Sequence, residues 1–371
     1  MPKIRIGILF GGKSVEHEVS VQSARSVYKA IDKTKFEIVL VGIDKSGRWR
    51  IGDLARLQAA DSPLTELASG NADTALAFIP GDGGDESGFE RRFPQLDVVI
   101  PLLHGTYGED GTVQGLLKLA GVPFVGAGVL GSAIGMDKDV AKRLLRDGGV
   151  PVARFVALSI SAAMETTFEA LAGQFGAPFF VKPANSGSSV GISKVRTPAE
   201  WVAARADAMR YDRKLLIEEF IKGREIEVAV LGNDNPKASV PGEVLPRHEF
   251  YSYEAKYLDE NGAVLRIPAE LSSERANQIR QLAVKSFCLL ECAGMARVDF
   301  FACDDGRVYV NEINTIPGFT KISMYPKLWE ASGLPYGELV EQLLRLAIER
   351  HNAEQKIETA YRPTLPDQQT P

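Results

Sequence analysis

Four polar side chains near residue 300 are of the types that bind a metal ion and an anion; they are Arg297, Asp299, Glu312 and Asn314. Two β-rich runs contain them, and Asp305-Gly306 stands between the runs, which is a strong hairpin signal. A two-residue turn at this pair places Asp299 opposite Glu312. It also places Arg297 opposite Asn314, so that all four side chains project from one face of the hairpin.

The chemistry of this face follows from its charges. Two carboxylates directly opposite each other on a β-ladder repel. A hard divalent cation reverses that repulsion, because Mg²⁺ takes carboxylate or amide oxygens and leaves its other positions to phosphate and water. An arginine beside such a site indicates an anion to be neutralised. The pattern therefore predicts a metal and phosphate site, with an ordinary exposed polar hairpin as the alternative.

Composition limits the classes of function. With 371 residues, the chain can form two or three domains with a sizeable core, and its net charge of −5 gives no sign of a nucleic-acid partner. Its three cysteines have no metal-binding spacing, and we expect buried reduced thiols. The first apolar run ends at Phe10, and no run reaches membrane-spanning length. We therefore expect a cytoplasmic protein without a membrane partner.

The order of strands and helices predicts the domains. In the first part, strands at Ile4–Phe10, Glu37–Ile43 and Leu96–Leu103 are separated by helical sequence, which predicts a parallel open α/β sheet. This domain spans 1–130, with an insertion at about 52–93 that is rich in Gly, Asp and Ser. Further strands and helices predict units at 131–220 and 221–351. The polar segment 352–371 is expected to be a disordered tail.

The segment Gly7–Ser14 matches the Walker A pattern, but its context argues against a phosphate loop. Its apolar residues continue the first strand, so the turn falls at Gly11–Lys13 and is shorter than a phosphate cradle. A P-loop phosphotransferase or GTPase is a competing hypothesis. Glu16 then begins a helix at the sheet edge, where it can receive an ammonium group or only compensate the helix dipole.

Other segments have the character of phosphate contacts. Lys182 ends a strand, and the small and hydroxyl residues up to Gly191 can donate hydrogen bonds to a phosphate chain, although a plain flexible loop is the alternative. Lys138 begins a helix, where a cation is unfavourable unless it points at an anion. Glu218 and Glu225 lie where a strand leads into a turn, and they can hold a ribose or adenine group or be solvated surface charges.

Three further segments complete the candidate set. His104 follows the third strand in a glycine-dense turn at the same sheet edge. The aromatic and polar segment Phe250–Tyr257 has the composition of a lid and contains Lys256. The Pro-Gly turn at Gly318 leaves the predicted metal strand, and its backbone donors can reach a developing oxyanion.

Taken in this order, the motifs resemble the D-alanine–D-alanine ligase family of the ATP-grasp superfamily from about Ile4 to His351. The motifs are Gly11–Ser20, His104–Gly111, Val181–Gly191, Tyr253–Tyr257, Arg297–Phe300 and Asn311–Thr320. The resemblance implies an N-terminal parallel sheet domain followed by a two-subdomain ATP-grasp fold of α+β type. It places ATP between the two subdomains and D-alanine toward the first domain.

The reaction that the resemblance implies is ATP-dependent ligation of two D-alanines for peptidoglycan precursors. ATP phosphorylates the carboxylate of one D-alanine, and the amine of the second attacks the acyl phosphate. A tetrahedral intermediate then yields D-alanyl-D-alanine and phosphate, with ADP as the other product. Such phosphoryl transfer needs chiefly positioning and charge neutralisation.

The resemblance also implies roles for single residues. Two Mg²⁺ ions, or Mn²⁺ in their place, would be held by Asp299, Glu312 and Asn314. ATP would be bound by Lys138, Lys182, Glu218, Glu225 and Lys256. The oxyanion hole would consist of Arg297 and the Gly318 N–H. A hydrogen-bonded catalytic set beside the first D-alanine would consist of Glu16, Ser188 and Tyr257. The substrates would further meet His104, Ser323 and Met324. A homodimer and an activating monovalent cation are family expectations.

Several alternatives stay open at this point. A nonenzymatic nucleotide-binding regulator would have no need of the complete metal and oxyanion set. A glutathione-synthetase-like or carboxylase activity would share the metal site but lack the set around Glu16. Relatives that make a D-alanyl–D-lactate ester have phenylalanine where this chain has Tyr257, so the tyrosine favours an amine as the acceptor.

Overall fold

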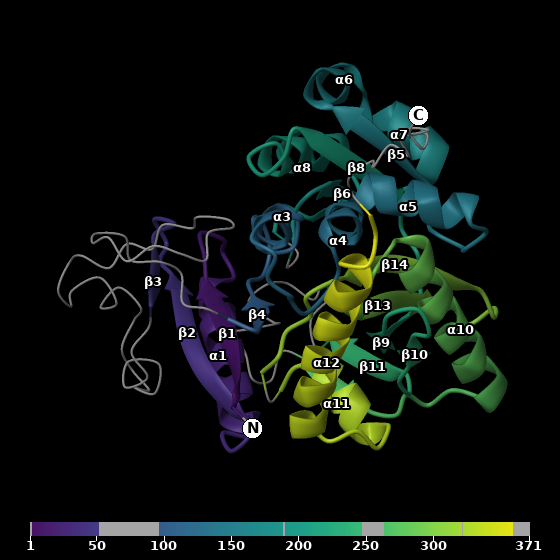
Figure 1. Ribbon diagram of the computed structural model, residues 1–371. Helices are drawn as coiled ribbons and strands as arrows, with labels where there is room; N and C mark the ends of the chain where they lie inside the picture. Colours follow the sequence, from purple (N-terminus) through teal and green to yellow (C-terminus); the bar gives the residue numbers. More distant parts are fainter. Residues whose placement is uncertain (1, 52–95, 188–189, 247–262, 321, 359–371) are drawn as a thin grey trace, which may run out of the picture.

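The computed structural model describes residues 2–51, 96–187, 190–246, 263–320 and 322–358, which form three β-sheets with helices packed around them (Figure 1). Each sheet comes from one continuous part of the chain. The predicted α/β class is confirmed, and the elements lie within a few residues of the predicted ranges.

The first sheet has the strand order β3-β2-β1-β4. Its strands are β1 (Ile4–Gly11), β2 (Phe36–Ile43), β3 (Trp49–Ile51) and β4 (Val98–Leu102). β1 pairs in parallel with both β2 and β4, as predicted, while the edge strand β3 is antiparallel to β2. Ile6, Ile8 and Phe10 of β1 are fully buried with apolar residues of α1 (His17–Ala30). The chain continues into α3 (Thr112–Leu119) and α4 (Val129–Met136).

The second sheet is antiparallel and has the order β5-β8-β6-β7. Its strands are β5 (Phe155–Ser159), β6 (Phe179–Pro183), β7 (Ser193–Val195) and β8 (Lys214–Glu219). Its helices are α6 (Ile160–Glu165), α7 (Phe168–Phe175) and α8 (Pro198–Ala208). Phe179 and Val181 are buried among apolar side chains of these helices, including Trp201. The alternate residue Lys182 therefore projects from the opposite face.

The third sheet has the order β12-β11-β9-β13-β14, and β10 pairs with β9. Its strands are β9 (Arg224–Gly232), β10 (Lys237–Ala238), β11 (Gly242–Pro246), β12 (Ala263–Arg266), β13 (Gly294–Ala302) and β14 (Val308–Asn314). One face is buried against α5 (Lys138–Asp147) and α10 (Ser273–Leu289). On the other face, Leu231 and Met295 belong to the core that includes α11 (Met324–Ala331) and α12 (Tyr336–Glu354).

α12 joins the first sheet to the third. Its buried residues Leu339, Leu343 and Leu344 share one core with β4 and with β9, and Figure 1 shows the yellow helix between the two sheets. Arg350 of α12 donates hydrogen bonds to the carbonyls of Gly126 and Phe124. The helix ends at Glu354, past the predicted end of the last domain at residue 351.

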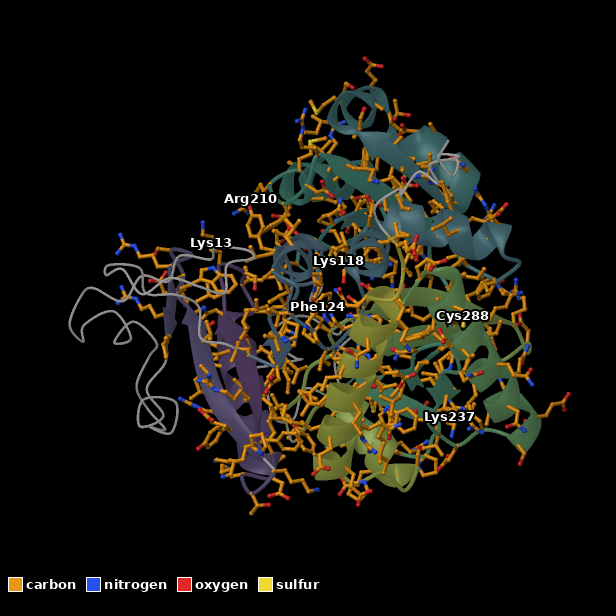
Figure 2. The ribbon with its side chains drawn as sticks, in the orientation of Figure 1. Lys13, Lys118, Phe124, Arg210, Lys237 and Cys288 are labelled. Carbon is orange, nitrogen blue, oxygen red and sulfur yellow. The ribbon has the colours of Figure 1, made fainter. Side chains whose placement is uncertain are left out.

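Two expectations from composition can be compared with the structure. None of the helices in the described ranges is long and apolar enough to cross a membrane. The three cysteines are free thiols, but burial was predicted for all of them, and Cys288 on α10 is exposed (Figure 2). The prediction of burial is therefore wrong for Cys288, because it projects from the outer side of an amphipathic helix, and holds for Cys292 and Cys303.

Candidate active site

The hairpin of β13 and β14 brings the four polar residues together with the predicted pairing. Asp299 lies opposite Glu312, and Arg297 lies opposite Asn314. The turn itself differs from the prediction, because the Cys303 N–H donates to the carbonyl of Arg307 and leaves three residues in the loop. A β-bulge next to Asp299 adds one residue to β14 and restores the predicted register.

The bulge residue is Asn311. On the turn side of the bulge, Phe300 pairs with Val310, whereas on the other side Asp299 pairs with Glu312. Asn311 and Glu312 are therefore both partly exposed, although regular alternation would bury one of them. The Asn311 Oδ1 accepts a hydrogen bond from Lys182 Nζ at 3.3 Å. The bulge thus directs a polar group of the third sheet toward the second.

Three carboxylates form a row across the third sheet. Glu227 of β9 pairs with Asp299, which pairs with Glu312 on its other side. Arg297 Nε and Nη2 donate to the two oxygens of Asp299 at 2.7 Å each, and Nε also lies 2.8 Å from Glu227 Oε2. Asn314 Nδ2 donates to Asp299 Oδ2 at 3.0 Å. One guanidinium therefore contacts two of the three carboxylates and leaves the row with net negative charge. By strand alternation, Glu225 lies on the same face as Glu227.

Two predicted phosphate-binding lysines face this row from neighbouring elements. Lys138, the first residue of α5, donates to the carbonyl of Ser186, and its Nζ lies 3.8 Å from Glu312 Oε2. Lys182 Nζ donates to Glu218 Oε1 at 3.1 Å as well as to Asn311. Cations from α5 and β6 thus face Glu312 and Asn311 of β14 across the space between the second and third sheets.

A third lysine, Lys142, lies behind this pair and is only 2% exposed. Its Nζ lies 3.0 Å from Glu218 Oε2, in a contact without hydrogen-bond angles. Burial lowers the pKa of Lys142 more than the charge of Glu218 raises it. Burial alone would raise the pKa of Glu218, but the charges of Lys142 and Lys182 hold it below its usual range. Glu218 is therefore a buried carboxylate that orients two lysines.

The first domain contributes Glu16, which is 5% exposed at the start of α1. A cavity of about 270 Å³ adjoins it, and its lining includes Lys13, Tyr107, Asn185 and Tyr211. Two glycines leave room for the carboxylate. A Cβ built on Gly105 would come 2.7 Å from Glu16 Oε2, and one on Gly187 would come 3.3 Å from it. The cavity thus brings the first domain against the loop after β6.

The segment after β14 lies against the first domain. His104 Nδ1 lies 3.0 Å from the carbonyl oxygen of Ile316, and Glu109 accepts hydrogen bonds from the N–H groups of Gly105 at 2.7 Å and Ile316 at 3.2 Å. Burial lowers the pKa of His104, although the charge of Glu16 acts to raise it. Burial, followed by the charge of Glu16, raises the pKa of Glu109 to about 8.

The same segment leads to the start of α11. Gly318 lies two residues after Ile316. None of the described residues accepts a hydrogen bond from the Gly318 N–H. Ser323 is the N-cap of α11, and Met324 is its first residue. The Ser323 Oγ accepts a hydrogen bond from the Thr320 N–H at 3.0 Å, and it accepts none from the N–H groups of the described residues of α11. The first N–H groups of α11 therefore point out of the helix, as at an anion site.

The Walker A hypothesis fails on the geometry of β1. The strand runs through Gly11, so Gly7 lies within the sheet. The Gly11 N–H donates to Ser20 Oγ at 2.7 Å, and the Gly12 N–H donates to the carbonyl of Ile43 at 2.8 Å. A phosphate cradle needs such groups to face the ligand. Lys13, labelled in Figure 2, instead runs along the turn at Gly47.

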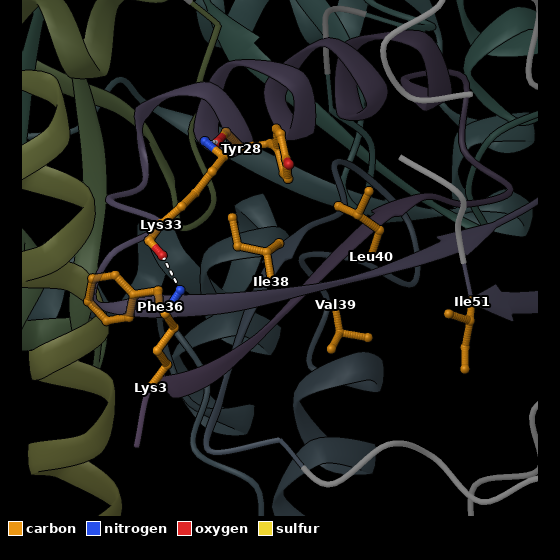
Figure 3. Close-up of a pocket in the computed structure, with 8 residues that line it drawn as sticks. All are labelled: Lys3, Tyr28, Lys33, Phe36, Ile38, Val39, Leu40 and Ile51. Carbon is orange, nitrogen blue, oxygen red and sulfur yellow. Dashed lines mark hydrogen bonds between the residues drawn. The ribbon is translucent and has the colours of Figure 1, made fainter. Parts of the chain in front are cut away.

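A larger cavity lies elsewhere, on the first sheet, but it lacks the chemistry of an active site. It has a volume of about 400 Å³ and is lined by Lys3, Tyr28, Lys33, Phe36, Ile38, Val39, Leu40 and Ile51 (Figure 3). Lys3 Nζ donates to the carbonyl of Lys33, and Lys33 Nζ donates to the carbonyl of Tyr28. Both lysine ammonium groups thus donate hydrogen bonds to backbone carbonyls.

Three predicted site residues, Ser188, Lys256 and Tyr257, lie outside the described residues. Four residues of the site were missed by the sequence analysis; they are Glu109, Lys142, Glu227 and Asn311. Each stands close to a predicted residue in the sequence. Lys142 is one helical turn from Lys138, Glu227 is two strand positions from Glu225, and Asn311 precedes Glu312.

The residues present fit a bound Mg²⁺. Asp299 and Glu312 supply carboxylate oxygens from adjacent strands, and Asn314 supplies an amide oxygen. No group of three or more His, Cys, Asp or Glu side chains among the described residues is arranged to hold a metal ion alone. Two carboxylates and an amide are nevertheless the kind of set with which Mg²⁺ is bound when phosphates and water complete its octahedron.

Comparisons with known proteins agree over nearly the whole chain. The family models of the D-ala D-ala ligase N-terminus and C-terminus match residues 5–127 and 144–345. A D-alanine–D-alanine ligase of Shouchella clausii is 52% identical over 365 residues, which cover 97% of this chain and 99% of the relative.

Solved structures agree as well. The D-alanine-D-alanine ligase from Coxiella burnetii has a TM-score of 0.85 and 44% identity, covering 96% of this chain and 97% of that chain. The VanG D-Ala:D-Ser ligase from Enterococcus faecalis has a TM-score of 0.80 and 35% identity, covering 93% of this chain and 100% of that chain.

Proposed function

This chain belongs to the D-alanine–D-alanine ligase family, and we propose from its site how it carries out the ATP-dependent ligation of two D-alanines for a cell-wall precursor. The second and third sheets form the ATP-grasp fold of this family. One observation carries the proposal for the site. The β13–β14 hairpin presents Asp299 and Glu312 together, while Lys138 approaches Glu312 from α5 and Lys182 approaches Asn311 from the second sheet.

The first D-alanine binds in the cavity beside Glu16. A carboxylate that is 5% exposed and lines a cavity attracts an ammonium strongly, because little water screens the charges. The ammonium would therefore settle on Glu16 and direct the substrate carboxylate toward the third sheet. Ser188 and Tyr257 complete the hydrogen-bonded set in this proposal, and His104 adds to the wall near the substrates.

Phosphoryl transfer depends on the charges between the two sheets. Lys138 and Lys182 neutralise the phosphates, while Glu218 holds Lys182 in place from behind. When bound, Mg²⁺ would be held by Asp299, Glu312 and Asn314 and would supply charge compensation to the phosphates. We assign Glu225 to the nucleotide and Lys256 to the γ-phosphate, in a segment that excludes water from the intermediate.

Peptide-bond formation needs donors for the oxyanion of the tetrahedral intermediate. Arg297 and the Gly318 N–H supply them from the hairpin and from the segment that follows it. The second D-alanine places its carboxylate at the start of α11, where Ser323 and the N–H of Met324 lie at the positive end of the helix. Its amine then attacks the acyl phosphate from the side of α11.

The activity is tested by ADP release with Mg²⁺-ATP and single amino acids. D-alanine should support turnover with D-alanyl-D-alanine as the product by mass, while L-alanine should not. D-serine and D-lactate are included because the VanG relative is a D-Ala:D-Ser ligase. Turnover with nucleotide alone, or with no dependence on D-alanine, would contradict the proposal.

Three further measurements test the remaining expectations. Replacing Mg²⁺ by Mn²⁺ tests the alternative metal, and adding K⁺ tests activation by a monovalent cation. The molecular mass in solution tests the homodimer.

A further inference from the structure

The segment that contains Gly318 is anchored on both sides by the first domain. Before Gly318, the peptide groups of Ile316 contact His104 and Glu109. After Gly318, the Phe319 N–H donates to Ser23 Oγ at 3.3 Å. The three anchoring residues come from α1 and from the turn after β4, far from Gly318 in the sequence. The backbone direction at Gly318 is therefore set by another domain.

His104 has one proton arrangement that satisfies its neighbours. The carbonyl oxygen of Ile316 can only accept, so Nδ1 must donate the hydrogen bond measured at 3.0 Å. Nε2 lies 3.3 Å from Ser23 Oγ. Burial lowers the pKa of His104 and favours the neutral ring, so Nε2 accepts from the Ser23 hydroxyl. The hydroxyl oxygen remains available to accept from the Phe319 N–H. The histidine and serine thus form one directional chain.

Glu109 holds the peptide group on the other side of the Ile316 Cα. Its Oε1 accepts from the Ile316 N–H and its Oε2 from the Gly105 N–H, so the carboxyl ties the turn after β4 to the segment after β14. His104 and Glu109 therefore bind both the carbonyl and the N–H of Ile316. With the peptide groups on both sides of the Ile316 Cα held, neither can rotate without breaking a buried hydrogen bond.

We propose that Ser23, His104 and Glu109 are positioning residues that fix the direction of the Gly318 N–H for the tetrahedral intermediate. The proposal rests on the proposed role of Gly318 in the oxyanion hole. An oxyanion donor must lie about 2.7–3.1 Å from the developing charge, so a small rotation of the segment weakens it. The first domain, which holds the first D-alanine, thereby also aligns the donor that acts on it.

The test separates the two chemical steps. Ser23→Ala, His104→Ala and Glu109→Gln should each lower kcat for dipeptide formation by about 10–100-fold, since a misplacement of about 1 Å can cost ~100-fold. In Ser23→Ala and Glu109→Gln, acyl-phosphate formation should stay near the parental rate, as followed by scrambling of a heavy-oxygen label between bridge and non-bridge positions of ATP. KM for ATP should not change. Ser26→Ala, on the same helix, is the matched control.

A conservative variant and a double variant sharpen the result. The side-chain amide of His104→Asn can take the place of Nδ1–H, so this variant should recover much of the kcat that His104→Ala loses. Ser23→Ala combined with His104→Ala should cost little more than either change alone, because both act on one segment.

Three outcomes would overturn the proposal: label scrambling that falls in parallel with dipeptide formation, no recovery by His104→Asn, or independent losses that multiply in the double variant. A parent enzyme that scrambles no label and forms no dipeptide would instead refute the proposed function itself. The two failures are therefore distinguishable.

Discussion

Lys142 and Glu218 are a buried ion pair in which each charge depends on the other. Lys142→Met leaves Glu218 with Lys182 as its remaining cation, and we expect it to lower the free energy of unfolding by about 3 kcal/mol. Adding Glu218→Gln removes the stranded charge and should restore part of this loss. Urea denaturation of both variants measures the effect. A double variant that is less stable than Lys142→Met would contradict this account.

Glu109 makes stability depend on pH, because its pKa is raised from 4.5 to about 8 by burial and by Glu16. The folded state then binds a proton more tightly than the unfolded state. The contribution is fully present below the unfolded pKa and is lost as pH rises through about 8. Glu109→Gln should flatten this decline between pH 4.5 and about 8 in urea denaturation. Glu16→Gln should move the decline to lower pH, and an unchanged profile in both variants would refute the assignment.

Asn311 is the extra residue of the bulge in β14 and has no pairing partner on β13. Deleting Asn311 lets Glu312 follow Val310 directly and keeps Asp299 opposite Glu312. We expect this deletion to fold with a loss of about 1–2 kcal/mol and to weaken ATP binding through the lost Lys182 contact. The matched deletion of Val310 moves Asn311 into the core and should cost about 2–5 kcal/mol. Equal stability of the two deletions, measured by thermal unfolding, would contradict this.

The hairpin also illustrates what sequence can and cannot predict. The pairing of Asp299 with Glu312 was predicted correctly, because Asp-Gly placed the turn to within one residue and the two strands were plain. The predicted two-residue turn was wrong, and the bulge cancelled its error. Nothing in the local pattern distinguishes Asn311 as an extra residue, since its conformation is tied to a contact with Lys182 from another sheet.

At the scale of the whole molecule, the contacts that were missed join segments distant in the sequence. Glu109 meets Ile316, and Lys182 meets Asn311, only after the three sheets have come together. Strand and helix patterns predicted the strands of each sheet, because such patterns depend on residues that are neighbours along the chain. Contacts between sheets depend on how whole faces pack, and no periodicity of one segment encodes them. The order of the family motifs predicted the candidate site, but Glu227 and Lys142, which lie close to these motifs in the sequence, were missed.

Because the proposed nucleotide site lies between two sheets, the affinity for nucleotide should appear as stability of the whole molecule. ADP at a concentration about 100 times its dissociation constant should raise the free energy of unfolding by about 2.7 kcal/mol in the presence of Mg²⁺. Chelation with EDTA should remove most of this gain, since Asp299 and Glu312 then face the phosphates without compensation. Asp299→Asn keeps the side-chain shape but loses the charge, and it should make the gain smaller and nearly independent of Mg²⁺. Asp305→Asn, at the exposed turn of the same hairpin, is the control and should behave as the parent. A gain that persists in EDTA, or that Asp299→Asn leaves unchanged, would show that the metal is not held at this hairpin.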